Sequence, residues 1–443
     1  LSLPIALQNI FSTAVSSADM VMVGAVGQNA LSAVSLAGQV QFVLNLIYLG
    51  LTLGTSLMAA QYRGRKDWDM VENILAFALK ISVSVSAVFC IAACFFSRQL
   101  MILFTSDLVL VEFGATYLRL AGASYLFMGV SQIYQAVLKA AGQTGKSTLI
   151  SSAALLLNFI FNAIFIFGLF GVPTMGVAGA ALGTLLARGI EMAWCLLDSA
   201  WGKTVQIRWV RIFRRDKLLA KDFWQYTLPI TLNGLSWGSA FASYSIIMGH
   251  LGSDVVAANS IATVARNFAM AGCNGLAAGA GIYLGALLGQ DKFDEARTDS
   301  TKIMGLTLGM GVVGGILILL FQPFLLGISD LTPRAEQYLR MMVFINAAYV
   351  ITQSINTMLN NGVFCAGGDT RFGLICDTID MWCFSVPLGF ICAFVLKLPP
   401  MAVYMILCLD EGAKMPFMLG HYRKNKWLKN ITIKMEEEAY DNG

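Results

Sequence analysis

Long apolar runs constrain the fold of this chain more than any other feature of its sequence. Each run is about twenty residues long, and charged or Gly/Pro-rich stretches separate one run from the next. Hydrophobic residues make up 57% of the 443 residues and charged residues only 13%, which is too few to cover a soluble protein of this size. The pattern excludes a soluble enzyme, a disordered chain and a transmembrane barrel of short alternating strands. It predicts an all-α polytopic membrane protein.

The runs predict about twelve transmembrane helices. The predicted spans are 3–24, 31–61, 74–97, 117–140, 147–170, 176–199, 226–249, 256–286, 303–326, 338–365, 373–396 and 401–422.

The chain also repeats itself at a nearly constant spacing. LPIALQNIF begins at Leu3 and LPITLNGLS begins at Leu228, and the same spacing pairs Gly24 with Gly249. Further matches are YLR at 117–119 with YLR at 338–340, and AGQT at 141–144 with AGGDT at 366–370. The sequence therefore predicts two similar halves.

Six spans per half insert both halves in the same direction, so we expect two six-helix bundles related by a pseudo-twofold axis along the membrane normal. The expected domains are an N-terminal bundle at 1–200, a basic cytoplasmic linker at 201–224, a C-terminal bundle at 225–423 and a cytoplasmic tail at 424–443. Two similar bundles that rock around a shared cavity are typical of transporters.

Lys and Arg residues predict the orientation, because cytoplasmic connections are enriched in them. They gather after the second, sixth, eighth and twelfth spans, whereas 25–30, 171–175 and 250–255 have none. We therefore expect both termini in the cytoplasm and the protein in the plasma membrane. The basic residues are Arg63, Arg65, Lys66, Lys203, Arg208, Arg211, Arg214, Arg215, Lys217, Lys221, Lys292, Arg297, Arg423, Lys424, Lys426, Lys429 and Lys434.

One acid stands out within the first span, because a charge in the hydrocarbon is costly and tends to mark function. Asp19 has no basic neighbour in sequence. Asn158 and Asn162 are four residues apart and share a face of the fifth span, and Thr184 of the sixth span can join them. These oxygens suit a proton or a small cation such as Na⁺ at Asp19. The alternative is that the amides only bond helices together.

Other polar residues in the first half give weaker signals. Arg188 and Glu191 are three residues apart, and we interpret them mainly as a structural ion pair. Tyr134 and Gln132 of the fourth span are candidates to face a cavity.

The second half carries a different set of charges in its apolar spans. Asp410 and Lys414 are spaced for an i,i+4 pair, and Arg266 needs an acidic partner such as Asp377 or Glu411. Such a network either carries protons or binds substrate, or it locks the second half as a rigid unit. The candidate residues are Arg266, Asp377, Asp380, Asp410 and Glu411.

Three short motifs and the duplication resemble the MATE (multidrug and toxic compound extrusion) transporters. The motifs are DMVMVGAVG at 19–27, GLTLGTS at 50–56 and GGDTRF at 367–372. The resemblance covers essentially the whole chain. It implies a transporter that exports lipophilic, often cationic small molecules in exchange for protons or sodium. We therefore expect no enzymatic activity and no cofactor.

The resemblance also assigns roles to individual residues. Asp19 matches the family's acid in the first helix, and Pro4 matches a proline at which that helix can kink. Asn158 matches an amide residue in the fifth span, and Thr184 matches a hydroxyl residue in the sixth span. Asn162 stands where several relatives have a second acid, so Asp19 is the lone carboxylate of the pocket. The expected partners are substrate, coupling cation and lipid, without nucleic acid, and the expected state is a monomer.

Two alternative functions remain at this point. A lipid-linked-precursor flippase of the same superfamily needs a cationic cavity for pyrophosphate, and the first half offers few intramembrane bases beyond Lys80, Lys139 and Arg188. A membrane-embedded enzyme is disfavoured because the sequence has no HExxH motif and no paired catalytic carboxylates at matched depth. The nine cysteines mostly lie in apolar runs, and we interpret them as small buried hydrophobes.

Overall fold

The computed structural model describes residues 2–202, 204–212, 216–327 and 331–432, and these ranges contain helices and turns but no strand. Lys203, Arg214, Arg215 and the tail beyond residue 432, which the sequence analysis assigns to cytoplasmic segments, lie outside the described ranges. The prediction of an all-α fold is confirmed.

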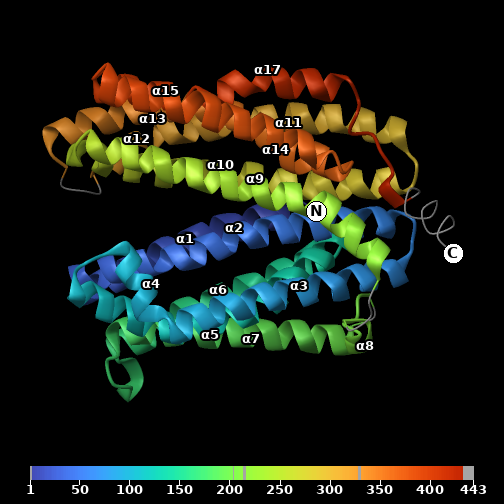
Figure 1. Cartoon of the computed structure of the whole chain (residues 1–443), viewed down its shortest axis with the longest axis horizontal. Helices are drawn as coiled ribbons and strands as arrows, with labels where there is room; N and C mark the ends of the chain where they lie inside the picture. The colour runs from blue at the N-terminus through green and yellow to red at the C-terminus, as the bar shows by residue number, and fades with distance from the viewer. Residues whose placement is uncertain (1, 203, 213–215, 328–330, 433–443) are drawn as a thin grey trace. The chain divides into compact units, whose positions relative to one another are not determined.

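The first half of the chain contains α1 to α8 (Figure 1). Acidic side chains begin two of its helices: Asp67 accepts a hydrogen bond from Met70 N at 3.0 Å, and Asp107 accepts one from Val109 N at 2.9 Å. Such N-caps satisfy amides that a helix leaves without partners. The bounds are α1 Ser2–Val26, α2 Gln28–Gly64, α3 Trp68–Phe95, α4 Ser97–Phe104, α5 Leu108–Ala140, α6 Thr144–Phe167, η1 Leu169–Gly171, α7 Gly176–Trp201 and α8 Trp209–Ile212.

The second half contains α9 to α17, with three π-helical segments among the described residues. The bounds are α9 Lys217–His250, α10 Ser253–Gly289, α11 Phe293–Leu320, α12 Gln322–Gly327, α13 Pro333–Thr357, η2 Met358–Phe364, α14 Thr370–Ile379, η3 Asp380–Ser385, α15 Val386–Phe390, η4 Ile391–Val395, α16 Pro400–Leu407 and α17 Asp410–Arg423.

The sequence repeat is also a repeat of the backbone. Adding the distance in sequence between Leu3 and Leu228 to the bounds of α2 gives the bounds of α10. The same addition to the bounds of α3 gives those of α11. The turns agree as well: Lys66 and Asp291 both have positive φ, at 64° and 59°. Gly27 and Gly252 separate the first two helices of each half with φ of 149° and 124°, a conformation that favours glycine.

The repeat spacing increases by one residue inside a π-helix. Helices α5 and α13 begin at Leu108 and Pro333, which are separated by the same number of residues as the starts of the earlier helix pairs. The next pair, α6 and α14, begins at Thr144 and Thr370, and this separation is one residue longer. Between these points lies η2, and a π-bulge accommodates one inserted residue. The YLR match falls about one helical turn short of the repeat spacing, so it does not mark equivalent positions.

The chain divides into two compact units. We call Phe11–Trp224 the first unit, and Leu1–Ile10 with Gln225–Gly443 the second unit. The start of α1 therefore belongs to the second unit, where Asn9 Nδ2 donates a hydrogen bond to Ala271 O at 3.4 Å.

Pro4 lies in the first turn of α1, where a missing backbone N–H costs no helical hydrogen bond. The same turn packs closely on α10, because a Cβ on Gly275 or Gly279 would meet Ala6 or Ser2. Helix α1 continues from this turn as one helix to Val26. A bend at Pro4 stays a prediction for another state of the protein.

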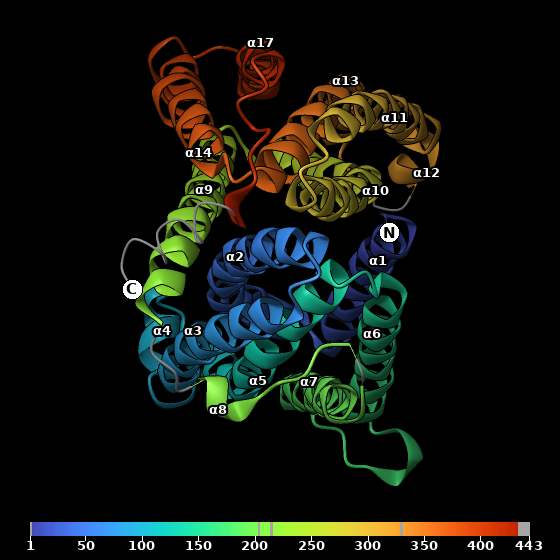
Figure 2. The same ribbon diagram turned by 90° about the vertical axis from the view of Figure 1, so that its right-hand side faces the viewer.

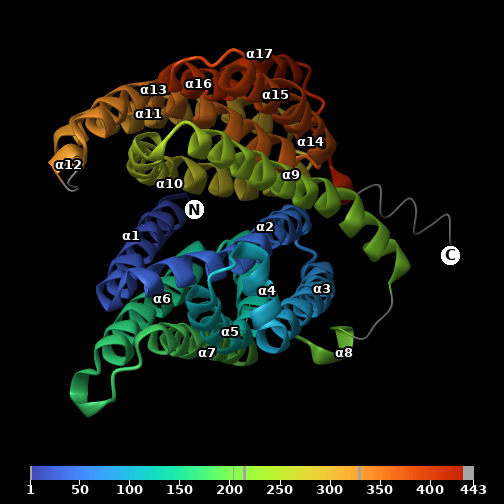
Figure 3. The ribbon, with the colours of Figure 1, turned by 60° about the vertical axis from the view of Figure 1, so that its left-hand side comes forward.

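In the first unit, α5 packs against α2, α3 and α7, and α6 packs against α7 (Figure 2). In the second unit, α10, α11 and α13 pack against one another in pairs (Figure 3). Large apolar side chains on the outer helices stay exposed, such as Phe95 at 77% and Val88 at 65%. These faces suit a lipid environment rather than water.

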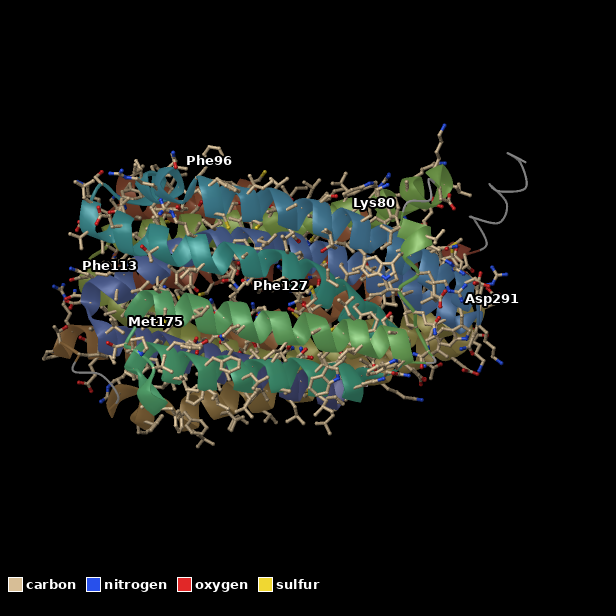
Figure 4. The ribbon with its side chains drawn as sticks, turned by 90° about the horizontal axis from the view of Figure 1, so that it is seen from below. Lys80, Phe96, Phe113, Phe127, Met175 and Asp291 are labelled. Carbon is tan, nitrogen blue, oxygen red and sulfur yellow. The ribbon has the colours of Figure 1, made fainter. Side chains whose placement is uncertain are left out.

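Nine helices in the described ranges are long and apolar enough to cross a membrane. Figure 4 shows Phe96, Phe113 and Met175 towards one end of the first unit's helices and Lys80 towards the other end.

Several predicted span boundaries are wrong. The helices of the seventh and ninth spans begin at Lys217 and Phe293 rather than at 226 and 303. The fourth span begins at Leu108 rather than 117, because Asp107 caps the helix there. The last span is interrupted at Cys408 and Leu409, which separate α16 from α17.

Candidate functional site

Asp19 lies in the first unit against a small apolar cluster formed by α1, α2, α6 and α7. The cluster contains Met22 and Val23 of α1, one turn beyond Asp19. Asn162 Nδ2 donates a hydrogen bond to Asp19 Oδ1 at 3.0 Å. Asp19 is half-buried, whereas the Asn162 side chain is only 2% exposed. The structure therefore brings these two predicted residues together.

Asn162 has a further oxygen available for a cation. Among the described residues, no donor reaches its buried Oδ1 atom. A buried carbonyl oxygen without a donor is costly, and a bound cation or water would satisfy it. With the Asp19 carboxylate alongside, the pocket has the negative, oxygen-rich character that a proton or Na⁺ requires.

A glycine on α7 makes this geometry feasible. A Cβ added to Gly183 would overlap Asn162 Oδ1 and lie 3.0 Å from Asn162 N. The absent side chain lets α6 and α7 approach closely, which is how small residues act in membrane helix packing.

Asn158 and Thr184 form the next layer of the same site. Asn158 Nδ2 donates to Thr184 Oγ1 at 3.2 Å, and Thr184 Oγ1 donates to Ala180 O at 3.0 Å. Tyr117 of α5 hydrogen-bonds to Thr184, and the charge of Asp19 acts on its hydroxyl group. The sequence analysis missed Tyr117, which is one of several polar residues of α5 and has no distinguishing signal in the sequence.

A separate polar network occupies α5, α6 and α7. Arg188 Nη1 donates to Glu191 Oε2 at 2.7 Å, so the predicted pairing of these two residues is confirmed. Gln135 Nε2 donates to Glu191 Oε1 at 2.8 Å, and Ser151 hydrogen-bonds to Gln135 Oε1. The Glu191 side chain is buried, at 2% exposure.

Tyr134 belongs to this polar region rather than to an open surface. It is 1% exposed, and its hydroxyl donates to Asp198 Oδ2 at 2.8 Å. Lys146 forms an ion pair with the same carboxylate. Gln132 is partly exposed on α5. A role of either residue towards a ligand stays a prediction.

The second unit contains a buried charge cluster that joins α14 and α17. Lys414 Nζ lies 3.0 Å from Asp377 Oδ1 and 3.1 Å from Glu411 Oε1. Asn233 and Asn360 each donate to Asp377 Oδ2 at 2.9 Å. Both acids are thus held by Lys414 and by amides from other helices.

The predicted pairing of Asp410 with Lys414 is wrong. Asp410 is the first residue of α17, and its Oδ1 accepts a hydrogen bond from Glu411 N at 2.7 Å. Its Oδ2 accepts one from the Tyr244 hydroxyl at 3.3 Å. The carboxylate therefore turns back over the helix start, and Lys414 pairs with Asp377 and Glu411 instead.

Arg266 also differs from its prediction. Its guanidinium carbon lies 5.4 Å from the Phe241 ring centroid and 5.3 Å from that of Tyr349, which are cation–π distances. The carboxylate that acts on it electrostatically is Asp410. Aromatic faces thus provide much of the stabilisation that we expected from Asp377 or Glu411.

Asparagines complete the second-unit cluster, and the sequence analysis missed them. Asn356 Nδ2 donates to Glu411 Oε2 at 2.7 Å, beside the contacts of Asn233 and Asn360 with Asp377. All lie in apolar stretches, so amides within spans were the available signal.

The helical fold, with its duplicated halves and its buried charges inside apolar helices, defines a polytopic transporter. Solved structures of transporters share this fold. An outward-facing multidrug resistance MATE family transporter of the MOP superfamily matches with a TM-score of 0.87 and 21% identity, covering 96% of this chain and 95% of that chain. A second match is a MOP superfamily transporter from Pyrococcus furiosus Vc1, which is described as having a binding pocket of reverse polarity. Its TM-score is 0.86 and its identity 21%, and the match covers 97% of this chain and 95% of that chain.

The family follows from the sequence. The MatE family model matches residues 4–164 and 229–391, so the chain belongs to the MATE family and is a multi-pass membrane transporter. Among curated proteins, the uncharacterized transporter YisQ of Bacillus subtilis is 21% identical over 97% of this chain and 94% of its own length. The probable multidrug resistance protein NorM of Agrobacterium fabrum is 24% identical over 90% of this chain and 86% of its own length.

Proposed function

We propose that this transporter exports lipophilic, often cationic small molecules in exchange for protons or sodium ions. The observation that carries the proposal is the contact of Asp19 with Asn162 in the first unit, at 3.0 Å. The probable multidrug resistance proteins among its relatives support the substrate class.

The carboxylate has two states with different affinities for a cationic substrate. Ionised Asp19 attracts a lipophilic cation, whereas Asp19 carrying a proton or sodium ion has no net charge to offer. A coupling cation entering from outside therefore weakens substrate binding and favours release. After the transporter turns inward, loss of the coupling cation restores the negative site for the next substrate.

The neighbouring side chains adjust to the charge on Asp19. Asn162 Nδ2 donates to the ionised carboxylate, and its Oδ1 is free to accept from a protonated carboxyl or to ligate a sodium ion. Thr184 and Asn158 position the α6–α7 face on which Asn162 lies. The site thus accepts either state without a large rearrangement of backbone.

The orientation and cellular location are also proposals. Arg208 and Arg211 lie between α7 and α9, Lys292 follows α10, and Arg297 lies near the start of α11. The positive-inside rule assigns these span ends to the cytoplasm. We place both termini in the cytoplasm and the protein, as a monomer, in the plasma membrane.

The test uses purified protein in proteoliposomes with a lipophilic cationic dye such as ethidium. Sodium and pH gradients are imposed separately, on the wild type and on Asp19→Asn. We expect dye export driven by at least one gradient in the wild type and its loss in Asp19→Asn. Asp299→Asn, at a surface acid paired with Lys302, is the matched control and should transport normally. Wild-type rates in Asp19→Asn would disprove the coupling role, and movement of pyrophosphate-linked lipids without dye export would favour a flippase.

A further inference from the structure

Asp380 is a buried acid of the second unit that the proposed export cycle leaves unused. It is the first residue of η3 and is 7% exposed. Among the described residues, no hydrogen-bond donor reaches its Oδ2 atom. The neighbouring acids Asp377, Asp410 and Glu411 all accept hydrogen bonds from named donors.

Charged groups face Asp380 from the elements packed around it. Lys414, Asp410 and Glu411 act on it from α17, and Asp377 acts on it from α14. Tyr244 of α9 and Cys376 of α14 also interact with it electrostatically. Helix α17 packs against both α14 and η3, and Figure 3 shows these elements on one side of the second unit.

Negative groups exceed positive groups in this region. Asp377, Asp380, Asp410 and Glu411 are buried, and the buried base Lys414 pairs with Asp377 and Glu411. Arg266 adds one positive charge near Asp410. If all were ionised, four negative charges would face two positive charges in a water-poor region, which is a costly arrangement. At least one of these acids therefore needs a further positive charge.

The missing charge is better supplied by a proton than by a metal ion. Among the described residues, no group of three or more acidic, histidine or cysteine side chains is arranged to hold a metal. The Lys414 ammonium group, which lies among the same acids, would repel a metal ion. A proton needs only one oxygen, and in the described part of the chain no donor competes for Asp380 Oδ2.

We infer that Asp380 is a second proton-carrying group of this transporter, in addition to the cation site at Asp19. In the loaded state an O–H bond forms at the Asp380 carboxylate with a proton taken from solvent, and the same bond breaks when the proton leaves. Its part in coupling rests on the proposed antiport, whereas its protonation does not.

The repeat shows that the two halves place their acids differently. The position equivalent to Asp19 is Tyr244, which donates to Asp410 and faces Asp380. Thr144 and Thr370 begin the equivalent helices α6 and α14, and the same separation in sequence makes Ala154 of α6 the position equivalent to Asp380. Asp19 thus has no acidic counterpart at its repeat position in the second half, and Asp380, at the start of a π-helical segment, has none at its repeat position in the first half. Such segments often mark functional positions.

Infrared difference spectroscopy tests the protonation directly. The purified wild type is compared at high and low pH, and the C=O stretching band of a protonated carboxyl group is followed. We expect a band that disappears in Asp380→Asn, shifts in Asp380→Glu, and remains in Asp19→Asn and in the surface control Asp299→Asn. A wild-type spectrum unchanged in Asp380→Asn would overturn the inference.

The reversal potential of transport in proteoliposomes tests the coupling role. The wild type should move one proton more per substrate than Asp380→Asn, while Asp299→Asn should match the wild type. An unchanged stoichiometry in Asp380→Asn would overturn the role of Asp380 in coupling. Failure of the proposed function would be distinct, because Asp19→Asn would then transport normally while the Asp380 band persisted.

Discussion

The two halves share a backbone repeat but arrange their buried charges in different ways. The first unit holds Asp19 with one amide donor, Asn162, whose own amide oxygen lacks a donor among the described residues. The second unit ties Asp377 and Glu411 to Lys414 through contacts of 3.0 and 3.1 Å. A carboxylate with few partners can change its charge easily, whereas a salt-bridged one resists change. The duplicated scaffold therefore supports one labile site and one largely fixed cluster with a single labile member, Asp380.

The largest expected effect comes from removing the base of the fixed cluster. Lys414→Met leaves Asp377 and Glu411 buried without their cation, and we expect a loss of about 3–5 kcal/mol in unfolding free energy. The unfolding midpoint of the detergent-purified protein measures it. Lys302→Met removes an exposed pair with Asp299 and should leave the midpoint unchanged. Equal midpoints for Lys414→Met and wild type would show that the cluster does not hold α14 and α17 together.

A smaller effect is expected at the packing contact beneath the labile site. Gly183→Ala puts a methyl group against Asn162 and should cost about 1–3 kcal/mol, because a close-packed interface cannot absorb it. It should also weaken cation-coupled dye export, since Asn162 must move away from Asp19. Gly189→Ala on the same helix is the control, as its Cβ would lie 3.6 Å from Phe127, an ordinary contact. Identical export by both variants would argue against a role for Asn162.

The smallest effect is expected at the repeat equivalent of Asp19. Tyr244→Phe removes the hydroxyl that donates to Asp410 at 3.3 Å and should cost about 1 kcal/mol. Because Tyr244 carries no charge in the cycle, the cation dependence of dye export should stay as in the wild type. Loss of that dependence would mean that the two equivalent positions are functionally similar after all.

Much of the fold could be predicted from the sequence, because apolar run length and repeat spacing are local properties. The same holds for Asp19 with Asn162 and for Arg188 with Glu191, where few partners compete. The second-unit cluster could not be predicted, since Lys414 lies among several acids and helical spacing allows a pair with either Asp410 or Glu411. Glu411 N donates a hydrogen bond to Asp410 Oδ1 at the first turn of α17, and that helix begins at an interruption within an apolar run, which spacing does not reveal.

The central claim is that the charge on Asp19 decides whether the first unit binds a cationic substrate. Binding of tetraphenylphosphonium to the purified protein, measured by isothermal titration calorimetry across pH and sodium concentration, tests it most directly. We predict that wild-type affinity falls as protons or sodium ions are added, and that Asp19→Asn binds weakly and equally under all conditions. An affinity of Asp19→Asn that varies with pH or sodium as the wild type does would contradict the account.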